Sequence, residues 1–484
     1  MLLTDSLLLD YKRCQRRAFL NLYGNEAERG SERDFLLKLR QESQKHIASV
    51  LAEYYPHYHQ PQTPRQNRLA RIAETKFLME QGAECIYEGY LAHDLRESTP
   101  EREGLTLLGH PHLLIKQTGK SRWGNWFYLP VSIQLGRRPK PEYKILAAFY
   151  AQLLAVWQDR FPPYAEIILR RQNRYQVDLG EWLPRLHTTI ADCLETLVPR
   201  QEPEVFISRQ RCSLCHWYDH CYAIAQSQQH LSLVPGVTPS RYESLQSLGV
   251  ITIQSLAQTH SGSMEETLGK AITSQLQLQA QAIIDNRAIA KQSSPKSSLP
   301  TAPIELYFDI EAEPERNLDY LLGVLVINHQ TGQETFHGFF AETPEDEGKI
   351  WQEFLALVKS YPTAPIFHFS EYEVETIKRL AQLYKTTRRE QEQILKRCVD
   401  LHHYVVNSVI LPVENYSLKT LANWLGFQWR DSNASGDQSV WWYDQWLEVG
   451  DRNFLELIMR YNEDDCRATW ILKDWLVKFF KEHK

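Results

Sequence analysis

The chain has 484 residues, of which 43% are hydrophobic, 24% charged and 11% aromatic. This composition is typical of globular domains and excludes a disordered or fibrous protein, and the length predicts about three domains. The sequence contains no apolar run of about 18 residues and no basic segment before its first apolar residues, so we expect no membrane span and no signal peptide. The expected location is the cytoplasm.

The net charge of -6 is unevenly distributed along the chain. Residues 1–300 carry 35 Lys and Arg against 30 Asp and Glu, whereas residues 301–484 carry 19 against 30. A mildly basic front part and an acidic back part suit a protein that holds nucleic acid with one part and acts on it with another.

The predicted elements divide the chain into four parts. The first begins with a helical stretch, continues through two strand-like segments and ends in helices. A run of short helices follows, with glycine turns at Gly236 and Gly249. A segment rich in Ser and Pro then indicates a linker, and strands alternate with helices in the final part. The fold class is therefore multidomain α/β, with parts at residues 1–228, 229–285, 286–302 and 303–484.

Four of the eight cysteines form a pattern typical of a metal site. Cys212, Cys215 and Cys221 lie close together in the sequence, and Cys14 lies far upstream. Four thiolates arranged in this way suit a tetrahedral zinc ion or a [4Fe-4S] cluster, and their spacing does not distinguish the two. The other cysteines lack partners at ligand spacing and are predicted to be buried free thiols: Cys85, Cys193, Cys398 and Cys466.

This quartet, with a strand pair between its members, resembles the iron-sulfur RecB-like nucleases, including the CRISPR adaptation nucleases, over residues 1–228. The resemblance implies a restriction-endonuclease-type α/β fold and a [4Fe-4S] cluster that joins the two ends of the domain, with Zn²⁺ as the alternative. Residues 229–285 are similar to helix-hairpin-helix modules, which present backbone N–H groups to phosphates. A small helical spacer is the alternative for that segment.

The catalytic positions of the RecB-like family carry other residues in this chain. His112, Ser132 and Gln134 stand where the resemblance requires two acidic residues and a lysine, Leu146 replaces a glutamine, and Tyr150 is kept. Without carboxylates a divalent metal lacks its hard oxygen ligands, so we expect an inactive domain that holds nucleic acid. His46 falls at the metal-binding histidine of the family, although a lone histidine on a helix is more often a surface residue. The basic residues available for phosphates are Arg137, Arg138, Lys140, Arg170, Arg171 and Arg174.

Two carboxylates, Asp309 and Glu311, end an apolar strand-like run near the start of the final part. Residues two apart in a strand point to the same face, so both side chains are expected at one place. Two like charges in such a place repel unless a divalent cation lies between them. The pair therefore predicts a metal site.

Further acidic residues complete a recognisable order. Tyr461 and Asp465 lie one helical turn apart in a helical run, and Glu373 follows another strand-like stretch. This order resembles the ribonuclease-H-like 3'-5' exonucleases of the DEDD family, in the subgroup with a tyrosine before the last aspartate. The resemblance covers residues 303–484 and implies a mixed-sheet fold and two Mg²⁺ or Mn²⁺ ions. Their implied ligands are Asp309, which bridges the ions, with Glu311, Glu373 and Asp465. Glu373 departs from the usual aspartate.

Two metal ions about 3.5 to 4 Å apart can activate a water and stabilise the leaving oxygen of a phosphodiester. Tyr461 would orient that water, because a phenol with a pKa of about 10 stays protonated near pH 7. We therefore expect a 3'-5' exonuclease acting on DNA rather than RNA, and on single strands. The alternatives are a non-catalytic nucleic-acid-binding protein and an accessory subunit of a separate helicase, since this chain has no Walker-type loop.

Overall fold

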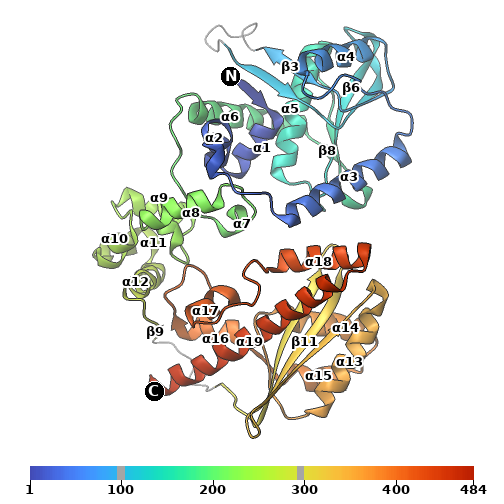
Figure 1. Ribbon diagram of the computed structural model, residues 1–484. Coiled ribbons are helices and arrows are strands. Elements are labelled where there is room, and N and C mark those ends of the chain that lie inside the picture. The colour runs from blue at the N-terminus through green and yellow to red at the C-terminus, as the bar shows by residue number, and fades with distance from the viewer. Residues whose placement is uncertain (95–103, 292–298, 484) are drawn as a thin grey trace. The chain divides into compact units, whose positions relative to one another are not determined.

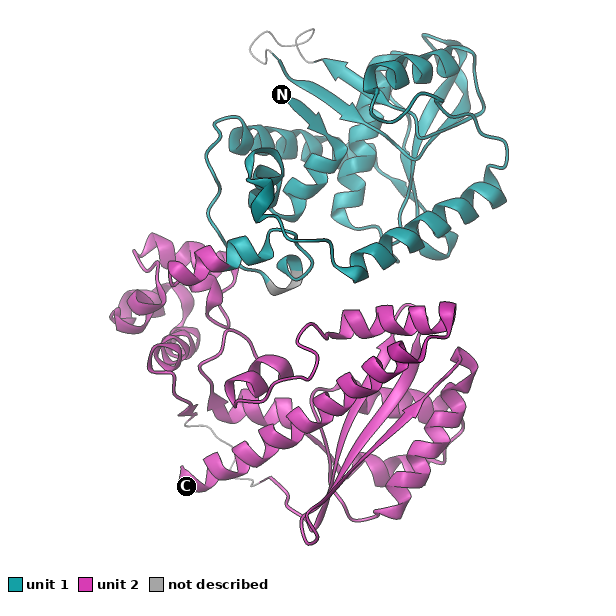
Figure 2. Cartoon of the chain, viewed as in Figure 1, with its two compact units in different colours: residues 1–222 teal, residues 223–484 magenta. Residues whose placement is uncertain are grey.

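The computed structural model describes residues 1–94, 104–291 and 299–483 (Figure 1). The chain forms two compact units, residues 1–222 and 223–484 (Figure 2), and each has its own hydrophobic core. No helix within the described residues is long and apolar enough to cross a bilayer.

A five-stranded sheet forms the centre of the first unit and packs against helix α5 (Pro141–Gln158). The strand order is β2-β5-β6-β7-β8, and only β6 and β7 are parallel neighbours. Helix α5 connects these two strands, because a parallel pair needs a crossover. Its Phe149 and Leu153 are fully buried. The strands are β2 (Cys85–Tyr87), β5 (Leu113–Ser121), β6 (Gly124–Ile133), β7 (Ala165–Ile168) and β8 (Arg174–Val177).

A small second sheet and further helices complete the first unit. The sheet has the order β1-β4-β3, and β1 pairs in parallel with β4. The predicted helical stretch near the start of the chain is present, and a three-residue strand precedes it. The sequence did not indicate this strand, because the partner of residues 2–4 comes only at residues 106–108. These elements are β1 (Leu2–Thr4), α1 (Asp5–Arg13), α2 (Gln15–Tyr23), η1 (Glu26–Glu28), α3 (Asp34–Tyr54), α4 (Arg68–Glu80), β3 (Leu91–Asp94), β4 (Thr106–Gly109), η4 (Arg170–Gln172), α6 (Leu179–Leu197), α7 (Arg209–Cys212) and α8 (Tyr218–Ser227), which continues into the second unit.

The second unit begins with a run of short helices. Gly236 and Gly249 lie in turns with φ of +92° and +76°, which glycine adopts without steric cost. The elements are η5 (Leu231–Leu233), α9 (Pro239–Ser247), α10 (Ile253–Gln258), α11 (Ser261–Leu268) and α12 (Lys270–Asp285).

Hydrogen bonds join these helices to the rest of the second unit. The side-chain amide of Gln279 in α12 donates to the carbonyl oxygen of Leu411 at 2.6 Å and accepts from the Tyr416 hydroxyl at 2.8 Å. Strand β9 (Ile289–Ala290) pairs with β15 (Val409–Ile410). Part of the predicted linker 286–302 is therefore a strand, and residues 292–298 of that linker lie outside the described residues.

A five-stranded mixed sheet forms the centre of residues 303–484. Its order is β12-β11-β10-β13-β14, with β12, β11 and β10 antiparallel and β10, β13 and β14 parallel. The strands are β10 (Ile304–Glu313), β11 (Leu318–Asn328), β12 (Gln333–Phe340), β13 (Ile366–His368) and β14 (Cys398–Asp400).

Helices cover both faces of this sheet (Figure 1). Phe308 packs on Phe354 of α13, with ring centroids 4.7 Å apart, whereas its neighbour Tyr307 belongs to the core cluster that includes Leu472 of α19. Alternate residues of β10 therefore face α13 and α19. The helices are η6 (Pro344–Asp346), α13 (Glu347–Ser360), α14 (Tyr372–Leu383), α15 (Arg388–Leu395), α16 (Leu401–Ser408), α17 (Leu418–Trp424), α18 (Gly436–Val449) and α19 (Arg452–Glu482).

Candidate metal centre

Three of the predicted ligands come together between β10 and α19. One carboxylate oxygen from each of Asp309, Glu311 and Asp465 lies within 4.8 Å of the other two. We call these three side chains the carboxylate trio. Three negative charges at this spacing repel one another unless they are protonated or share a cation. Oxygen ligands are those that Mg²⁺ and Mn²⁺ prefer, so the donor set of the trio fits either ion.

The protonation of the trio reflects this crowding. Burial, together with the charges of Asp465, Glu311 and Glu373, raises the pKa of Asp309 well above its ordinary value. Burial and Asp465 raise the pKa of Glu311 in the same direction. Burial raises the pKa of Asp465 to about 7, although hydrogen bonds from Trp429 and Tyr461 act against the rise. A bound cation would favour the ionised forms.

A glycine lets α19 approach the sheet at the trio. Gly323 on β11 pairs directly with Asp309, and a Cβ at position 323 would lie 1.6 Å from the side-chain oxygen of Asn462 in α19. The Asn462 side chain is fully buried in the space above Gly323, and its Nδ2 donates to Oδ2 of Asp309 at 2.7 Å. Asn462 therefore holds one oxygen of the first predicted ligand.

Two adjacent aspartates of α19 have different partners. Asp465 accepts from Nε1 of Trp429 at 2.7 Å. Asp464 accepts from the backbone N–H of Arg430 at 2.9 Å and from its Nε at 2.8 Å. Asp464 is thus engaged by an arginine, while Asp465 belongs to the trio, as the spacing from Tyr461 predicts.

Tyr461 lies one turn before Asp465 on the same face of α19. Burial and the negative charges of Asp465, Glu311 and Asp309 raise the pKa of the Tyr461 phenol well above its ordinary value. The phenol therefore keeps its proton at neutral pH. It can donate a hydrogen bond but cannot act as a base.

Glu373 is not part of the group within 4.8 Å. It lies in the first turn of α14 and is 5% exposed. It accepts a hydrogen bond from Oγ of Ser370 at 3.1 Å, and Nδ1 of His368 lies 3.5 Å from the same carboxylate. Its charge still raises the pKa of Asp309, so Glu373 lies within electrostatic reach of the trio but is held by neighbours of its own.

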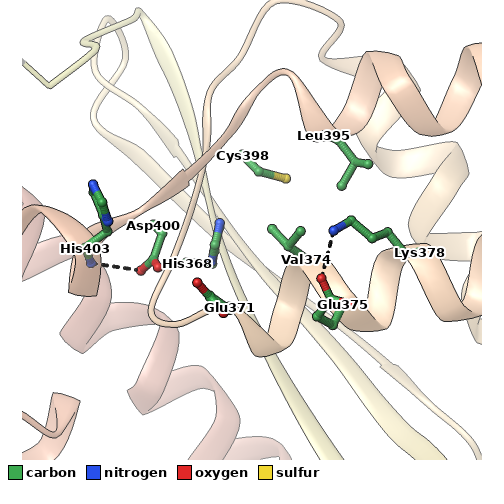
Figure 3. A pocket seen from close by; sticks show the side chains of 9 residues that line it. All are labelled: His368, Glu371, Val374, Glu375, Lys378, Leu395, Cys398, Asp400 and His403. Carbon is green, nitrogen blue, oxygen red and sulfur yellow. Dashed lines mark hydrogen bonds and ion pairs between the residues drawn. The ribbon is translucent and has the colours of Figure 1, made fainter.

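A pocket of about 380 Å³ lies at the edge of the sheet beside Glu373. His368 lines this pocket as well as approaching Glu373. Figure 3 shows the side chains that surround it, among them Glu371 and Lys378 of the α14 region and Asp400 at the end of β14. Oδ1 of Asp400 accepts from the backbone N–H groups of His402 and Ser370, so this carboxylate caps α16 and does not belong to the trio.

The comparison with known families agrees with this geometry. Residues 306–477 match the family described as RNase_H superfamily. The C-terminal part of the chain is a ribonuclease-H-like domain. No curated protein matches the chain. The match covers the carboxylate trio, Tyr461 and Glu373, and the mixed sheet of the ribonuclease-H-like domain carries Asp309 and Glu311, the first two predicted ligands, on its central strand β10.

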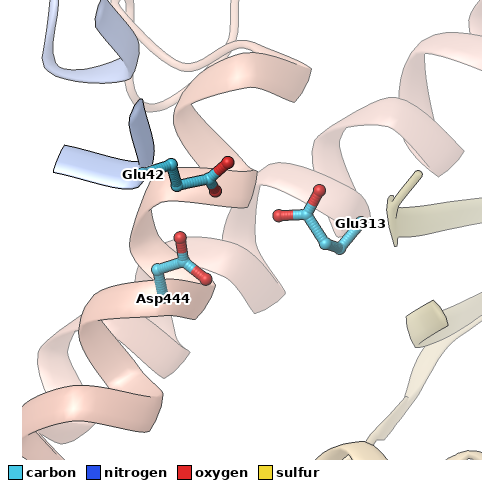
Figure 4. A group of neighbouring side chains, drawn as sticks. All are labelled: Glu42, Glu313 and Asp444. Atoms are coloured by element: carbon cyan, nitrogen blue, oxygen red, sulfur yellow. The ribbon is translucent and has the colours of Figure 1, made fainter. Parts of the chain in front are cut away.

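Other carboxylates of the ribonuclease-H-like domain have ordinary roles. Figure 4 shows Glu313 at the end of β10 and Asp444 in α18. Asp444 forms an ion pair with Arg316 at 2.8 Å. This pair links α18 to the turn after β10, and we assign no metal to it.

The residues at the positions predicted for a decayed site in the first unit are buried or partly buried. His112 has its pKa lowered to about 4 by burial, and its Nδ1 accepts the backbone N–H of Ile133 at 3.2 Å. The Ser132 hydroxyl is buried without a hydrogen-bond partner among the described residues. Leu146 is in the core. Burial and Arg170 lower the pKa of His46.

Tyr150 contacts a residue that the sequence did not single out. Its hydroxyl donates to Oδ2 of Asp5 at 2.8 Å, and the same oxygen lies 2.7 Å from Nδ1 of His110. Asp5 is 2% exposed, and through His110 it anchors α1 to the loop after β4. Among the basic residues proposed for phosphates, Arg170 pairs with Glu42 at 2.6 Å and Arg174 with Glu166 at 2.9 Å.

The four predicted cysteine ligands are neighbours in the first unit. Cys14 lies between α1 and α2, and its charge acts on the thiols of Cys212, Cys215 and Cys221. None of the four forms a disulfide. Within the described residues, no three of these sulfur atoms lie as close together as the oxygens of the trio. The chain fold thus brings Cys14 to the distant cysteine segment, and no disulfide uses any of the four thiols.

The cysteines outside the quartet are also free, and Cys85, Cys193 and Cys466 are buried while Cys398 is partly exposed. Asn462 and Trp429, which hold two members of the trio, were not identified from the sequence. Asn462 lies inside the Tyr461 motif but carries no charge. Trp429 comes from a separate segment 36 residues before Asp465, where it looks like any core aromatic.

Proposed function

We propose that the ribonuclease-H-like domain is a metal-dependent 3'-5' exonuclease that hydrolyses phosphodiester bonds of nucleic acid. The observation that carries this proposal is the carboxylate trio on the central strand and on the helix that crosses it, with one oxygen from each residue within 4.8 Å of the others, Glu311 buried, and Asp309 and Asp465 partly buried. Tyr461, one turn before Asp465, adds the donor that the DEDD resemblance requires.

Asp309, Glu311 and Asp465 would hold two Mg²⁺ or Mn²⁺ ions. Such a pair supplies an activated water and stabilises the leaving oxygen. Asn462 holds one oxygen of Asp309, and Trp429 holds one oxygen of Asp465, so both carboxylates present their remaining lone pairs in fixed directions. The protonated Tyr461 orients the attacking water by a hydrogen bond. Glu373 acts as the fourth acidic residue of the site.

The position of Glu373 favours one alternative function. Ser370 and His368 hold the carboxylate of Glu373 outside the trio. The site therefore resembles a metal site that has lost one ligand, which is what we would expect in a non-catalytic nucleic-acid-binding protein. The variant Glu373→Asp helps to distinguish the enzyme from the non-catalytic binding protein, because it introduces the usual residue of the DEDD family. An active enzyme with Glu373 as a ligand should keep or gain activity on this change.

The first unit would support this activity without cutting. We propose that residues 1–228 are an inactive RecB-like domain that holds nucleic acid and that residues 229–285 act as a helix-hairpin-helix-like module. Neither His112, whose pKa burial lowers to about 4, nor the buried Ser132 hydroxyl supplies a carboxylate, and this supports the loss of a divalent metal site. The resemblance to RecB-like nucleases is the reason for proposing DNA, in single strands, and a separate helicase as a partner.

The cysteine quartet would bind a [4Fe-4S] cluster, with Zn²⁺ as the alternative. Four thiols that are neighbours and form no disulfide suit both. Thiolates about 2.3 Å from a zinc ion would have their sulfur atoms about 3.8 Å apart. No three of the four sulfur atoms are within 4.8 Å of one another among the described residues, so the thiols would have to move closer together to bind zinc. The metal would tie the α1–α2 loop to α7 and α8.

A digestion assay with the full-length chain tests the proposal. Single-stranded DNA, duplex DNA and RNA carry a label at the 5' end or at the 3' end, and Mn²⁺ is added. A 3'-5' exonuclease releases the 3' label at once as mononucleotide and shortens the 5'-labelled strand stepwise. Binding of all three substrates without any digestion would instead support the non-catalytic alternative, and internal cuts would contradict the exonuclease assignment.

A further inference from the structure

A lysine that the sequence motifs did not include lies beside the trio. Lys419 is in α17, which packs on α19. Its positive charge acts on Asp465. Its Nζ donates to the carbonyl oxygens of Ala434 at 2.7 Å and Ser432 at 3.1 Å. An ammonium group has three N–H donors, so one donor of Lys419 is not used by the described residues.

Trp429 fixes both Lys419 and the trio. The ammonium of Lys419 lies 5.6 Å from the centre of the Trp429 ring, and the indole N–H of the same residue donates to Asp465 at 2.7 Å. Trp429 is 6% exposed and packs with Ala422 and Ala468. A rigid, buried side chain thus sets the distance between the cation and the carboxylate.

A second lysine of the same domain shows what a structural ion pair looks like here. Lys473 of α19 is 3% exposed, and its Nζ contacts both oxygens of Glu305 at 2.8 and 2.7 Å. Lys419 has no carboxylate within 4.0 Å among the described residues. The ammonium group of Lys419 contacts two carbonyl oxygens and an aromatic ring, and these uncharged groups do not neutralise its positive charge.

We infer that Lys419 is a further catalytic residue, which donates its remaining N–H to a phosphate oxygen of the substrate at the trio, and that Trp429 is the positioning residue for it. The inference rests on the proposed function, because that function supplies the phosphodiester. Negative charge on the phosphate oxygens persists through the displacement, and a preorganised cation stabilises this charge without reorganisation. The lysine moves no proton, and no further reactant is needed.

The test uses the full-length chain with Lys419→Met, Lys419→Arg and Trp429→Phe. Lys481→Met is the matched control, because Lys481 is an exposed lysine in the last turn of α19. Three quantities are measured: the kcat and KM of digestion, the affinity for Mn²⁺ by titration calorimetry, and the affinity of the Mn²⁺-loaded protein for thymidine 5'-monophosphate. Melting temperatures show whether each variant is folded.

Loss of one preorganised donor should lower kcat by about 100- to 1000-fold. In Lys419→Met the affinity for thymidine 5'-monophosphate should fall about tenfold or more, while the affinity for Mn²⁺ changes little. Lys419→Arg should restore part of both losses, and Trp429→Phe should lower kcat more than it raises KM.

Three results would overturn the inference. One is nucleotide affinity and kcat at wild-type levels in folded Lys419→Met. Another is a fall in Mn²⁺ affinity as large as the fall in nucleotide affinity, because Lys419 would then only balance the charge of Asp465. The third is a Mn²⁺-loaded wild type that does not bind the nucleotide. A wild type that binds the nucleotide through Lys419 but digests nothing would refute the proposed function and leave the phosphate contact standing.

Discussion

Asp309 on β10 pairs directly with Gly323 on β11, and the volume that a side chain at position 323 would occupy holds the amide of Asn462. The hydrogen bond from Asn462 to Asp309 therefore depends on the absence of a Cβ on the neighbouring strand. This relationship allows α19 to bring Tyr461 and Asp465 to the two carboxylates of β10.

Gly323→Ala should destabilise the ribonuclease-H-like domain by about 1–3 kcal/mol, because the new methyl group would force Asn462 and α19 away from the sheet. Thermal unfolding measures this cost. Gly338→Ala on β12 is the matched control. Its Cβ would meet the flexible end of Met459, at 2.2 Å, and this side chain can move more easily than a buried amide bonded to Asp309.

A double variant checks the cause of that loss. In an Asn462→Ala background the clash partner is absent, so Gly323→Ala should cost about 0.5 kcal/mol or less, and the two changes should show strong coupling. If Gly323→Ala costs the same with and without Asn462, the close packing of these two residues is not what limits position 323.

Metal binding should become more stabilising as pH rises. Burial raises the pKa of Asp465 from its ordinary value of 3.8 to about 7 in the folded protein, and the pKa values of Asp309 and Glu311 are raised in the same direction. The folded state then binds more protons than the unfolded state between these pH values. The stability of the metal-free protein therefore falls from about pH 4 towards pH 7 through these groups.

Metal cations that replace the protons on these carboxylates should reverse the loss of folding stability. At 100 times its dissociation constant, Mn²⁺ should stabilise the protein by about 2.7 kcal/mol, or roughly 5–10 °C for a domain of this size. The increase in melting temperature on adding Mn²⁺ should be small at pH 5 and large at pH 8. An increase that is equal at both values, or that persists in Asp309→Ala, would place the stabilising ion elsewhere.

The cysteine site makes a separate prediction. Anaerobically purified protein should be brown and absorb near about 400 nm if the quartet binds an iron-sulfur cluster. Cys215→Ser should lose the colour and melt at a lower temperature, because the metal links the two ends of the first unit. Cys193→Ser, in a buried cysteine outside the quartet, should keep the colour. Colourless protein with one zinc ion would support the alternative metal.

Local periodicity in the sequence was enough to predict one part of the site, namely the residues that share a face of a strand or a helix. Alternation in β10 places Asp309 and Glu311 on one face, and the helical turn between Tyr461 and Asp465 selects Asp465 over Asp464. The roles of Trp429 and Lys419 could not be predicted from the sequence, because their approach to Asp465 depends on how the segment before α18 folds over α19. The same limit applies to β9, a two-residue strand that exists only because β15 pairs with it.

Glu373 shows a different limit of sequence reasoning. Its place in the motif order predicts a ligand, but its final position depends on packing in three dimensions. Ser370, in an unusual backbone conformation with φ of +137°, and the buried His368 hold its carboxylate beside the trio and outside it. Neither contact follows from spacing along the chain.

The most direct measurement of the central claim compares the adjacent aspartates of α19. Asp465→Asn removes a carboxylate of the trio, whereas Asp464→Asn removes one of the two carboxylates that pair with Arg430. In full-length protein with single-stranded DNA and Mn²⁺, Asp465→Asn, like Asp309→Ala, should abolish release of the 3' nucleotide and weaken Mn²⁺ binding while DNA binding persists. Asp464→Asn should stay within a few-fold of wild type. Undiminished digestion by Asp465→Asn, or equal losses in both variants, would contradict a catalytic centre at the carboxylate trio.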